Sequence, residues 1–165
     1  MSEPTAFSGG CQCGAVRFCA HDLNDDAHIC HCRMCQKAVA NAFISLVSVD
    51  TDRLEWTRGA ATEFFSSAKT ARGFCARCGT PLYMRDTDGT KVFLTIGAFD
   101  EPDRVPPRRQ VGNEGRRAWF ASLHALPGNA TTEEAWPEGA AAIKASNRQH
   151  PDHDTEFWPP EGRIE

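Results

Sequence analysis

The sequence predicts a single, mainly β domain that is stabilised by metal-bound cysteines. Two observations predict this class: short segments of alternating or β-branched residues are separated by turns, and eight cysteines stand in closely spaced groups. The length of 165 residues, with 41% hydrophobic content, suffices for one hydrophobic core but not for two domains of comparable size.

The first half of the chain is expected to supply most of the strands. Residues 15–20 alternate in polarity, so Val16 and Phe18 share one face of a strand and Arg17 lies on the other. Residues 36–42 fit a short helical turn, whose backbone amides would face neighbouring thiolates favourably. Further strands are expected at residues 43–49, 54–57 and 63–67.

The next segment predicts a β-hairpin. Residues 82–84 and 92–96 are apolar and β-branched, and the polar stretch between them contains an Asp-Gly pair that suits a hairpin turn. A further strand is expected at residues 118–120, and the domain as a whole is expected to span residues 1–126.

Residues 127–165 form a C-terminal extension. Residues 131–146 contain enough Ala and Glu for a helix, whereas the rest is rich in proline and scattered charge. Trp136, Phe157 and Trp158 predict that the extension docks, on the domain or on a neighbouring subunit, because a disordered tail would carry fewer aromatic residues. A homodimer is therefore one option.

Composition restricts the possible partners and the compartment. The formal charge of -4 and a pI of about 5.9 provide no basic face for nucleic acid. Residues 1–7 have neither a cationic start nor an apolar run, and no window approaches a membrane span, so we expect a cytoplasmic protein that does not associate with membranes. Cysteines in a reducing compartment favour metal binding; the alternative is a secreted disulfide scaffold.

Seven of the eight cysteines fall into groups with metal-ligand spacing. Two pairs cannot saturate zinc separately, so the simplest partition joins them into one closed four-cysteine site and leaves the triplet with a second ion and an empty position. An alternative mixes members of the triplet with the pairs. Cys19 is expected to be a half-buried thiol without a metal. The pairs are Cys11 with Cys13 and Cys75 with Cys78, and the triplet is Cys30, Cys32 and Cys35.

The open site indicates the kind of substrate. Three thiolates make zinc a weaker Lewis acid than three histidines would, so a reactive hydroxide is disfavoured and a sulfur compound is the natural fourth ligand. His31 and His28 are candidates for the fourth ligand, but in extended geometry His31 would point away from its neighbours Cys30 and Cys32. We therefore expect a small thiol to bind there.

Cationic side chains close to the cysteines have two candidate roles. They could offset the negative charge of the zinc thiolates, or they could anchor the carboxylates of a thiol such as glutathione. Arg33, Lys37 and Arg72 are the candidates for the second role, and Arg17 and Arg77 share only the first. Trp56 and Phe74 are expected in the core rather than in a pocket.

The cysteine motifs and their flanks resemble the glutathione-dependent formaldehyde-activating enzyme family over residues 8–126. The resemblance implies the β-tent fold and two zinc ions, a structural one on the two cysteine pairs and a second on the triplet. Gln110 departs from the pattern, since members often carry His there, and residues beyond about 127 have no counterpart. The matching motifs lie at residues 10–18, 30–37, 64–67 and 72–83.

The function implied by the resemblance is that of a zinc-dependent carbon–sulfur lyase, similar to S-hydroxymethylglutathione synthase, which acts on a glutathione-like thiol adduct. Cys30, Cys32 and Cys35 would be the catalytic residues. The alternative is a non-catalytic zinc-binding module for protein interaction, since fold alone does not decide function. A third reading is a sensor in which oxidation of the triplet releases its metal.

Overall fold

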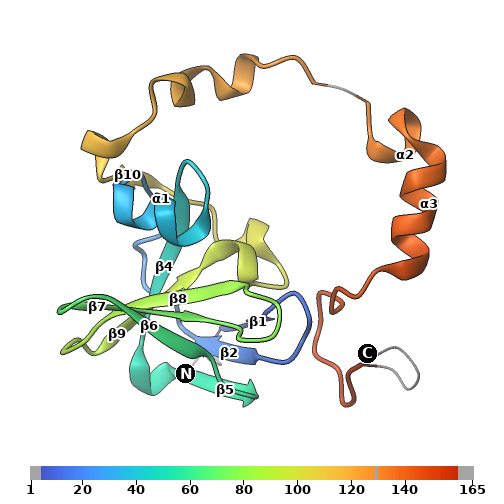
Figure 1. Ribbon diagram of the computed structural model, residues 1–165. Coiled ribbons are helices and arrows are strands. Elements are labelled where there is room, and N and C mark those ends of the chain that lie inside the picture. Colours follow the sequence, from blue (N-terminus) through green and yellow to red (C-terminus); the bar gives the residue numbers. More distant parts are fainter. Residues whose placement is uncertain (1–4, 129, 160–165) are drawn as a thin grey trace.

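The computed structural model describes residues 5–128 and 130–159, and the strands within these ranges form two sheets (Figure 1). The mainly β prediction is confirmed. The smaller sheet has the order β1 (Ala6–Gly10), β2 (Arg17–His21) and β5 (Leu54–Arg58). The larger sheet has the order β10 (Arg109–Val111), β3 (His28–Cys30), β4 (Ile44–Asp50), β9 (Lys91–Thr95), β8 (Pro81–Asp86), β7 (Thr70–Phe74) and β6 (Thr62–Ser67).

Strand pairing brings the late segment 109–111 to the first half of the chain. Strands β6 to β9 form an antiparallel meander, and β8 with β9 is the predicted hairpin. By contrast, β10 pairs in parallel with β3, which places Val111 opposite Cys30. The loop that follows β10 therefore lies beside the cysteine triplet.

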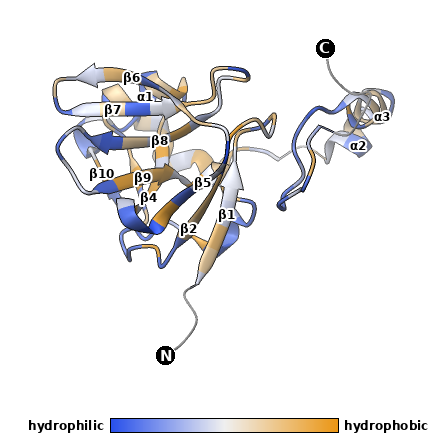
Figure 2. Cartoon of the chain, turned by 90° about the horizontal axis from the view of Figure 1, so that it is seen from below, coloured by the Kyte–Doolittle hydropathy of each residue, from blue (hydrophilic) through white to orange (hydrophobic). Residues whose placement is uncertain are grey.

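The core is shared by strands of both sheets. The Phe18 side chain is fully buried, and its ring makes edge contacts with Trp56 and Phe99. Gly9 permits this packing, because a Cβ at that position would come within 2.5 Å of the Phe18 ring. Trp56 packs against the core, as expected. Hydrophobic residues are concentrated on the strands of this body (Figure 2).

Helical segments are short and lie outside the sheets. Helix α1 (Arg33–Val39) begins directly after Cys32, three residues before the predicted turn at 36–42. It ends at Val39, and the next residue, Ala40, has a left-handed backbone. The strand expected at 118–120 is wrong: i→i+3 bonds, such as the one from the Phe120 N–H to the Arg117 carbonyl (3.0 Å), take the backbone groups that a strand needs. The described 3-10 helices are η1 (Thr51–Arg53), η2 (Ile96–Ala98), η3 (Pro102–Arg104), η4 (Asn113–Gly115) and η5 (Ala118–Ala125).

The C-terminal extension contains two helices, α2 (Thr132–Ala135) and α3 (Pro137–Ser146), where one was predicted. Both views place them away from the sheets (Figures 1 and 2). The side chains of Trp136 and Phe157 are largely exposed, at 60% and 78%. Across the described chain, no helix combines the length and apolar character that crossing a membrane requires.

Candidate functional site

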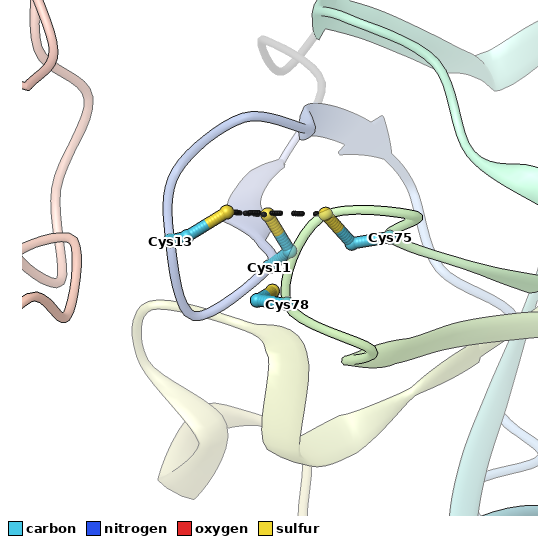
Figure 3. Close-up of side chains that lie close together, drawn as sticks. All are labelled: Cys11, Cys13, Cys75 and Cys78. Atoms are coloured by element: carbon cyan, nitrogen blue, oxygen red, sulfur yellow. Dashed lines mark hydrogen bonds between the residues drawn. The ribbon is translucent and has the colours of Figure 1, made fainter. Parts of the chain in front are cut away.

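Four cysteines meet where the turn between β1 and β2 approaches the turn between β7 and β8 (Figure 3). The structure brings together the two predicted pairs, Cys11 with Cys13 and Cys75 with Cys78, and their four Sγ atoms all lie within 4.8 Å of one another. The Sγ atom of Cys13 lies 3.6 Å from that of Cys11 and 3.9 Å from that of Cys75. A tetrahedron with metal–sulfur bonds of about 2.3 Å has sulfurs about 3.8 Å apart. The spacing therefore fits a tetrahedral zinc.

Each of these turns closes on a glycine with a positive φ. The Gly14 N–H donates to the Cys11 carbonyl at 2.9 Å, and the Gly79 N–H donates to the Cys75 carbonyl at 2.8 Å. Their φ angles of 71° and 77° suit glycine, which carries no Cβ. The Val16 N–H also donates to the Cys11 Sγ at 3.2 Å, which favours a thiolate at that sulfur.

Burial and hydrogen bonding shift the pKa values of Cys11 and Cys78 in opposite directions. Burial raises the pKa of Cys11 to about 12. Burial also acts to raise the pKa of Cys78, but hydrogen bonds from the Thr80 hydroxyl and backbone outweigh it and lower this pKa to about 6. Cys11 and Cys75 are only 3% and 1% exposed, so a metal held here would be largely screened from solvent. This cluster suits a structural ion.

The three remaining clustered cysteines lie at the junction of β3 and α1. Cys30 ends β3, Cys32 is the N-cap residue of α1, and Cys35 lies within the first turn of the helix. Their Sγ atoms also lie within 4.8 Å of one another. In the described part of the chain, no further Cys, His, Asp or Glu completes this group. Three sulfurs leave one position of a tetrahedral ion for another ligand.

The triplet is polarised even without a metal. The hydrogen bond from Cys30 is the largest influence on Cys35 and, with one from Arg72, it outweighs burial and lowers the pKa of Cys35 to about 5. The pKa of Cys30 is raised well above its usual range by the same bond to Cys35 and by burial. Arg72 on β7 places its Nη2 atom 3.5 Å from the Cys35 Sγ. Its positive charge therefore stabilises a thiolate in the triplet.

The two histidines considered as ligands have other partners. The His31 ring is fully buried, donates from Nε2 to the Gln110 side-chain oxygen at 2.9 Å, and packs edge-on against Phe120. The His28 Nδ1 atom donates to the Asp26 carbonyl at 2.8 Å. No ring nitrogen of His28 or His31 belongs to the sulfur cluster. This agrees with the expectation that His31 points away from it.

The basic residues near the cysteines differ in role. Arg72 is buried and bonded to a cluster sulfur, so it neutralises charge rather than anchoring a carboxylate. The expectation that Arg17 offsets thiolate charge is wrong: it is 3% exposed and forms ion pairs with Asp100 and Asp154, both at 2.6 Å. Arg33, Lys37 and Arg77 are exposed.

No pattern in the sequence indicates that Gln36 belongs to the site. It is 2% exposed, and its side-chain amide donates to the His31 carbonyl at 2.6 Å and to the Gly115 carbonyl at 2.7 Å. These bonds fasten the triplet loop to the segment after β10. A Cβ at Gly112 would lie 2.6 Å from the Cys32 nitrogen, so glycine allows this segment to cover Cys32. In the sequence, Gly112 is the only indication that this segment lies close to Cys32.

The C-terminal extension contacts the four-cysteine cluster. The His150 N–H donates to the Gln12 carbonyl at 2.7 Å, and the Trp158 indole donates to the Cys13 carbonyl at 2.8 Å. A Cβ at Gly14 would meet both the His150 and the Trp158 rings, within 2.3 and 2.5 Å. His150 and Trp158 therefore pack on the turn that carries Cys13.

Two hollows adjoin the clusters. One, of about 400 Å³, includes Cys11, Cys78 and residues 149–152 in its lining. The other, of about 350 Å³, includes Arg72 and lies beside the triplet. Phe74 lines this second hollow, so the expectation that it belongs to the core is wrong.

A two-sheet framework with one four-sulfur and one three-sulfur cluster defines a cysteine-rich β protein with two sites that could hold metal ions. The family model described as glutathione-dependent formaldehyde-activating enzyme matches residues 6–114, and the chain belongs to this family. The resemblance seen in the sequence is thereby confirmed.

The fold also has a counterpart among solved structures. A crystal structure of a Rhodobacter sphaeroides protein, a target of the Northeast Structural Genomics effort, matches with a TM-score of 0.52 and 21% sequence identity. The match covers 63% of this chain and 99% of that chain. The matched part of this chain therefore shares its fold with that protein.

Proposed function

We propose that the protein is a zinc-dependent enzyme of the carbon–sulfur lyase type, which joins a glutathione-like thiol to formaldehyde and reverses that step. The observation that carries the proposal is the incomplete three-sulfur cluster in a chain of this family. In the forward step, the thiol sulfur forms a bond to the aldehyde carbon, the C=O π bond breaks, and the proton released by the thiol reaches the oxygen. The product is a hydroxymethyl thioether.

Cys30, Cys32 and Cys35 would hold the ion of the catalytic site, and Cys11, Cys13, Cys75 and Cys78 would hold a structural ion. A zinc ion held by these three thiolates would supply a fourth coordination position, at which a thiol would be kept deprotonated near neutral pH. Arg72 offsets part of the accumulated negative charge, because its guanidinium lies against the Cys35 sulfur. Cys30 and Cys35 are buried, whereas Cys32 is partly exposed, so a thiol is expected to approach beside Cys32.

The remaining assignments follow from this function. All eight cysteines are free, which suits the reducing cytoplasm and the high thiol concentration that such an enzyme needs. We assign residues 1–126 to a β-tent catalytic domain and residues 127–165 to an extension that packs on it or on the second subunit of a homodimer.

One observation favours the second candidate, a non-catalytic zinc module that binds another protein. The stretch from η5 to α3 exposes large apolar side chains, among them Trp119 at 53%, Leu126 at 62% and Ile143 at 55%. Aromatic side chains such as that of Trp119 are enriched at protein–protein interfaces. If the protein is such a module, we expect it to bind two ions but no thiol.

Exchange NMR separates the two candidates. With zinc-loaded protein, we expect the exchange between glutathione and S-hydroxymethylglutathione to be faster than the uncatalysed exchange, and Cys32→Ser to abolish the difference. The Co²⁺-substituted protein should change its absorption when glutathione is added. Two bound ions with neither effect would refute the enzyme and leave the module.

A further inference from the structure

The hollow beside the triplet is lined mainly by apolar side chains. It has a volume of about 350 Å³ and lies between the end of α1, the start of β4 and the strands β6 to β8. Volumes of this order hold small organic ligands. The lining side chains that present carbon are those of Ala38, Val39, Ile44, Phe64, Phe74, Pro81 and Tyr83.

Shared residues connect this hollow to the sulfur cluster. Arg72 lines the hollow and also bonds to the Cys35 Sγ. Ile44 and Val39 line it as well, and both pack in the apolar cluster that contains Cys30 and Cys35. None of the three cysteines is part of the lining, so the hollow adjoins the sulfur cluster through Arg72, Ile44 and Val39.

The polar groups at the hollow are already engaged. Arg72 is the one charged side chain in the lining, and it bonds to Ser66 Oγ at 3.2 Å as well as to Cys35. The Tyr83 hydroxyl donates to a Glu63 carboxylate oxygen at 2.9 Å, and burial raises its pKa to about 12, so it stays neutral. The walls thus offer apolar surface and no carboxylate.

The Tyr83 ring can occupy its position because the residue opposite it in the β7–β8 pair is a glycine. Gly73 and Tyr83 are register partners, and a Cβ at Gly73 would lie 2.1 Å from the Tyr83 ring. The ring therefore lies over the glycine and forms one wall of the hollow. Phe64, from the edge strand β6, contributes a second aromatic wall and is 62% exposed.

We infer that this hollow binds the apolar substituent of an aldehyde larger than formaldehyde, so that the preferred substrate class is an aliphatic or aromatic aldehyde. A hydroxymethyl group has two heavy atoms and would fill only a small part of about 350 Å³. The only charged side chain that lines the hollow is Arg72, and it already bonds to Ser66 and Cys35, so the hollow offers no free cation for the carboxylates of glutathione. This inference rests on the proposed function.

The reaction with such an aldehyde balances without any other reactant. The thiol sulfur forms a bond to the carbonyl carbon, the C=O π bond becomes a C–OH group, and the thiol proton ends on that oxygen. The substituent on the carbonyl carbon is unchanged. The free energy gained by burying this substituent beside Phe64, Phe74 and Tyr83 distinguishes one aldehyde from another.

Binding of S-methylglutathione and S-hexylglutathione to the zinc-loaded protein tests this assignment without turnover. Burial of each CH₂ group should strengthen binding by about fourfold until the hollow is filled, so the hexyl compound should bind at least about tenfold more tightly. In ¹⁵N NMR spectra, the amides of Gly73 and Gly79 should shift with the hexyl compound and not with the methyl compound.

A matched pair of variants controls for folding. Phe64 and Phe65 are adjacent on β6 and almost equally exposed, at 62% and 60%, but only Phe64 lines the hollow. Phe64→Ala should weaken S-hexylglutathione binding several-fold and leave S-methylglutathione binding unchanged. Phe65→Ala should change neither affinity.

The outcomes separate this inference from the proposed function. Equal affinity for the two compounds, or equal effects of Phe64→Ala and Phe65→Ala, overturns the inference even if exchange with formaldehyde is accelerated. If no aldehyde is accelerated but the hexyl preference and the Gly73 shift are present, the proposed function fails while the hollow is still an apolar ligand site. Faster addition to butanal than to formaldehyde, relative to the uncatalysed rates, supports both.

Discussion

Loss of one sulfur should have very different consequences at the two clusters. Cys78→Ser removes a ligand from the four-sulfur cluster, which joins Cys13 and Cys75 across 62 positions of the chain. If a metal cross-link acts on the unfolded chain as a disulfide does, closing a loop of this length contributes about 4 kcal/mol. For a protein of this size, a loss of about 4 kcal/mol lowers the melting temperature by about 10 °C.

Cys32→Ser should remove the second ion with little effect on stability. The triplet spans only Cys30 to Cys35, so its ion closes a short local loop. Cys32 is also the N-cap residue of α1 and makes no capping bond through its side chain, and serine is preferred at this position. We expect the melting temperature of this variant to stay within about 2 °C of the unmodified protein.

Scanning calorimetry together with metal analysis by mass spectrometry checks both variants. Cys19→Ser is the control, because Cys19 lies outside both clusters and its Sγ atom lies 3.5 Å from the His21 ring. It should keep two ions and its melting temperature. Equal destabilisation by Cys78→Ser and Cys32→Ser would refute the division of the sulfurs into a structural and an open site.

Two further predictions concern charged groups. In metal-free protein, Arg72→Gln should raise the pKa of Cys35, which ultraviolet thiolate absorbance across a pH titration would detect; an unchanged pKa would contradict the role given to Arg72. Asp100→Asn should cost about 3 kcal/mol in urea unfolding, because Arg17 then loses its buried carboxylate partner and keeps only Asp154, whose side chain is 60% exposed. Asp154→Asn should cost less than about 1 kcal/mol, because the buried pair with Asp100 is kept. The pKa of Asp100 is lowered in the folded state because hydrogen bonds from Arg17 and Ser8 outweigh burial, so its contribution is present above the ordinary carboxyl pKa and is lost as the pH falls through the lowered value. Asp100→Asn should lack that acid-dependent loss.

The features that the sequence predicts well are those set by local patterns. Alternation in residues 15–20 and the Asp-Gly turn between β8 and β9 are local signals, and the structure contains the corresponding strands. The cysteine groups are also local, because CxC and CxxC spacing brings two sulfurs together through one turn. The prediction that the two pairs join across the fold rests only on the fact that zinc takes four ligands.

The features that the sequence missed depend on contacts between distant segments. Arg17 was expected beside thiolates, but its partners Asp100 and Asp154 lie 83 and 137 positions away. The strand expected at 118–120 failed because its apolar residues carry no signal that distinguishes a strand from a 3-10 helix. The parallel pairing of β10 with β3 is equally invisible to local patterns, and it decides what covers Cys32.

The helix that carries Cys35 shows the same limit at a smaller scale. Its start depends on Cys32, which takes the N-cap position with a backbone that is not helical, although cysteine is not a preferred cap. The buried Gln36 side chain then holds the loop through carbonyls of His31 and Gly115. No spacing rule signals that a glutamine after a cysteine triplet is buried.

The most direct test of the unequal sharing of sulfur is X-ray absorption at the zinc edge, with and without glutathione. With four sulfurs at one ion and three at the other, the zinc-loaded protein should average about 3.5 sulfur ligands per ion. Saturation with glutathione should raise this value to about four. An average of four before glutathione is added, or a value that glutathione does not change, would contradict an open site that accepts a thiol.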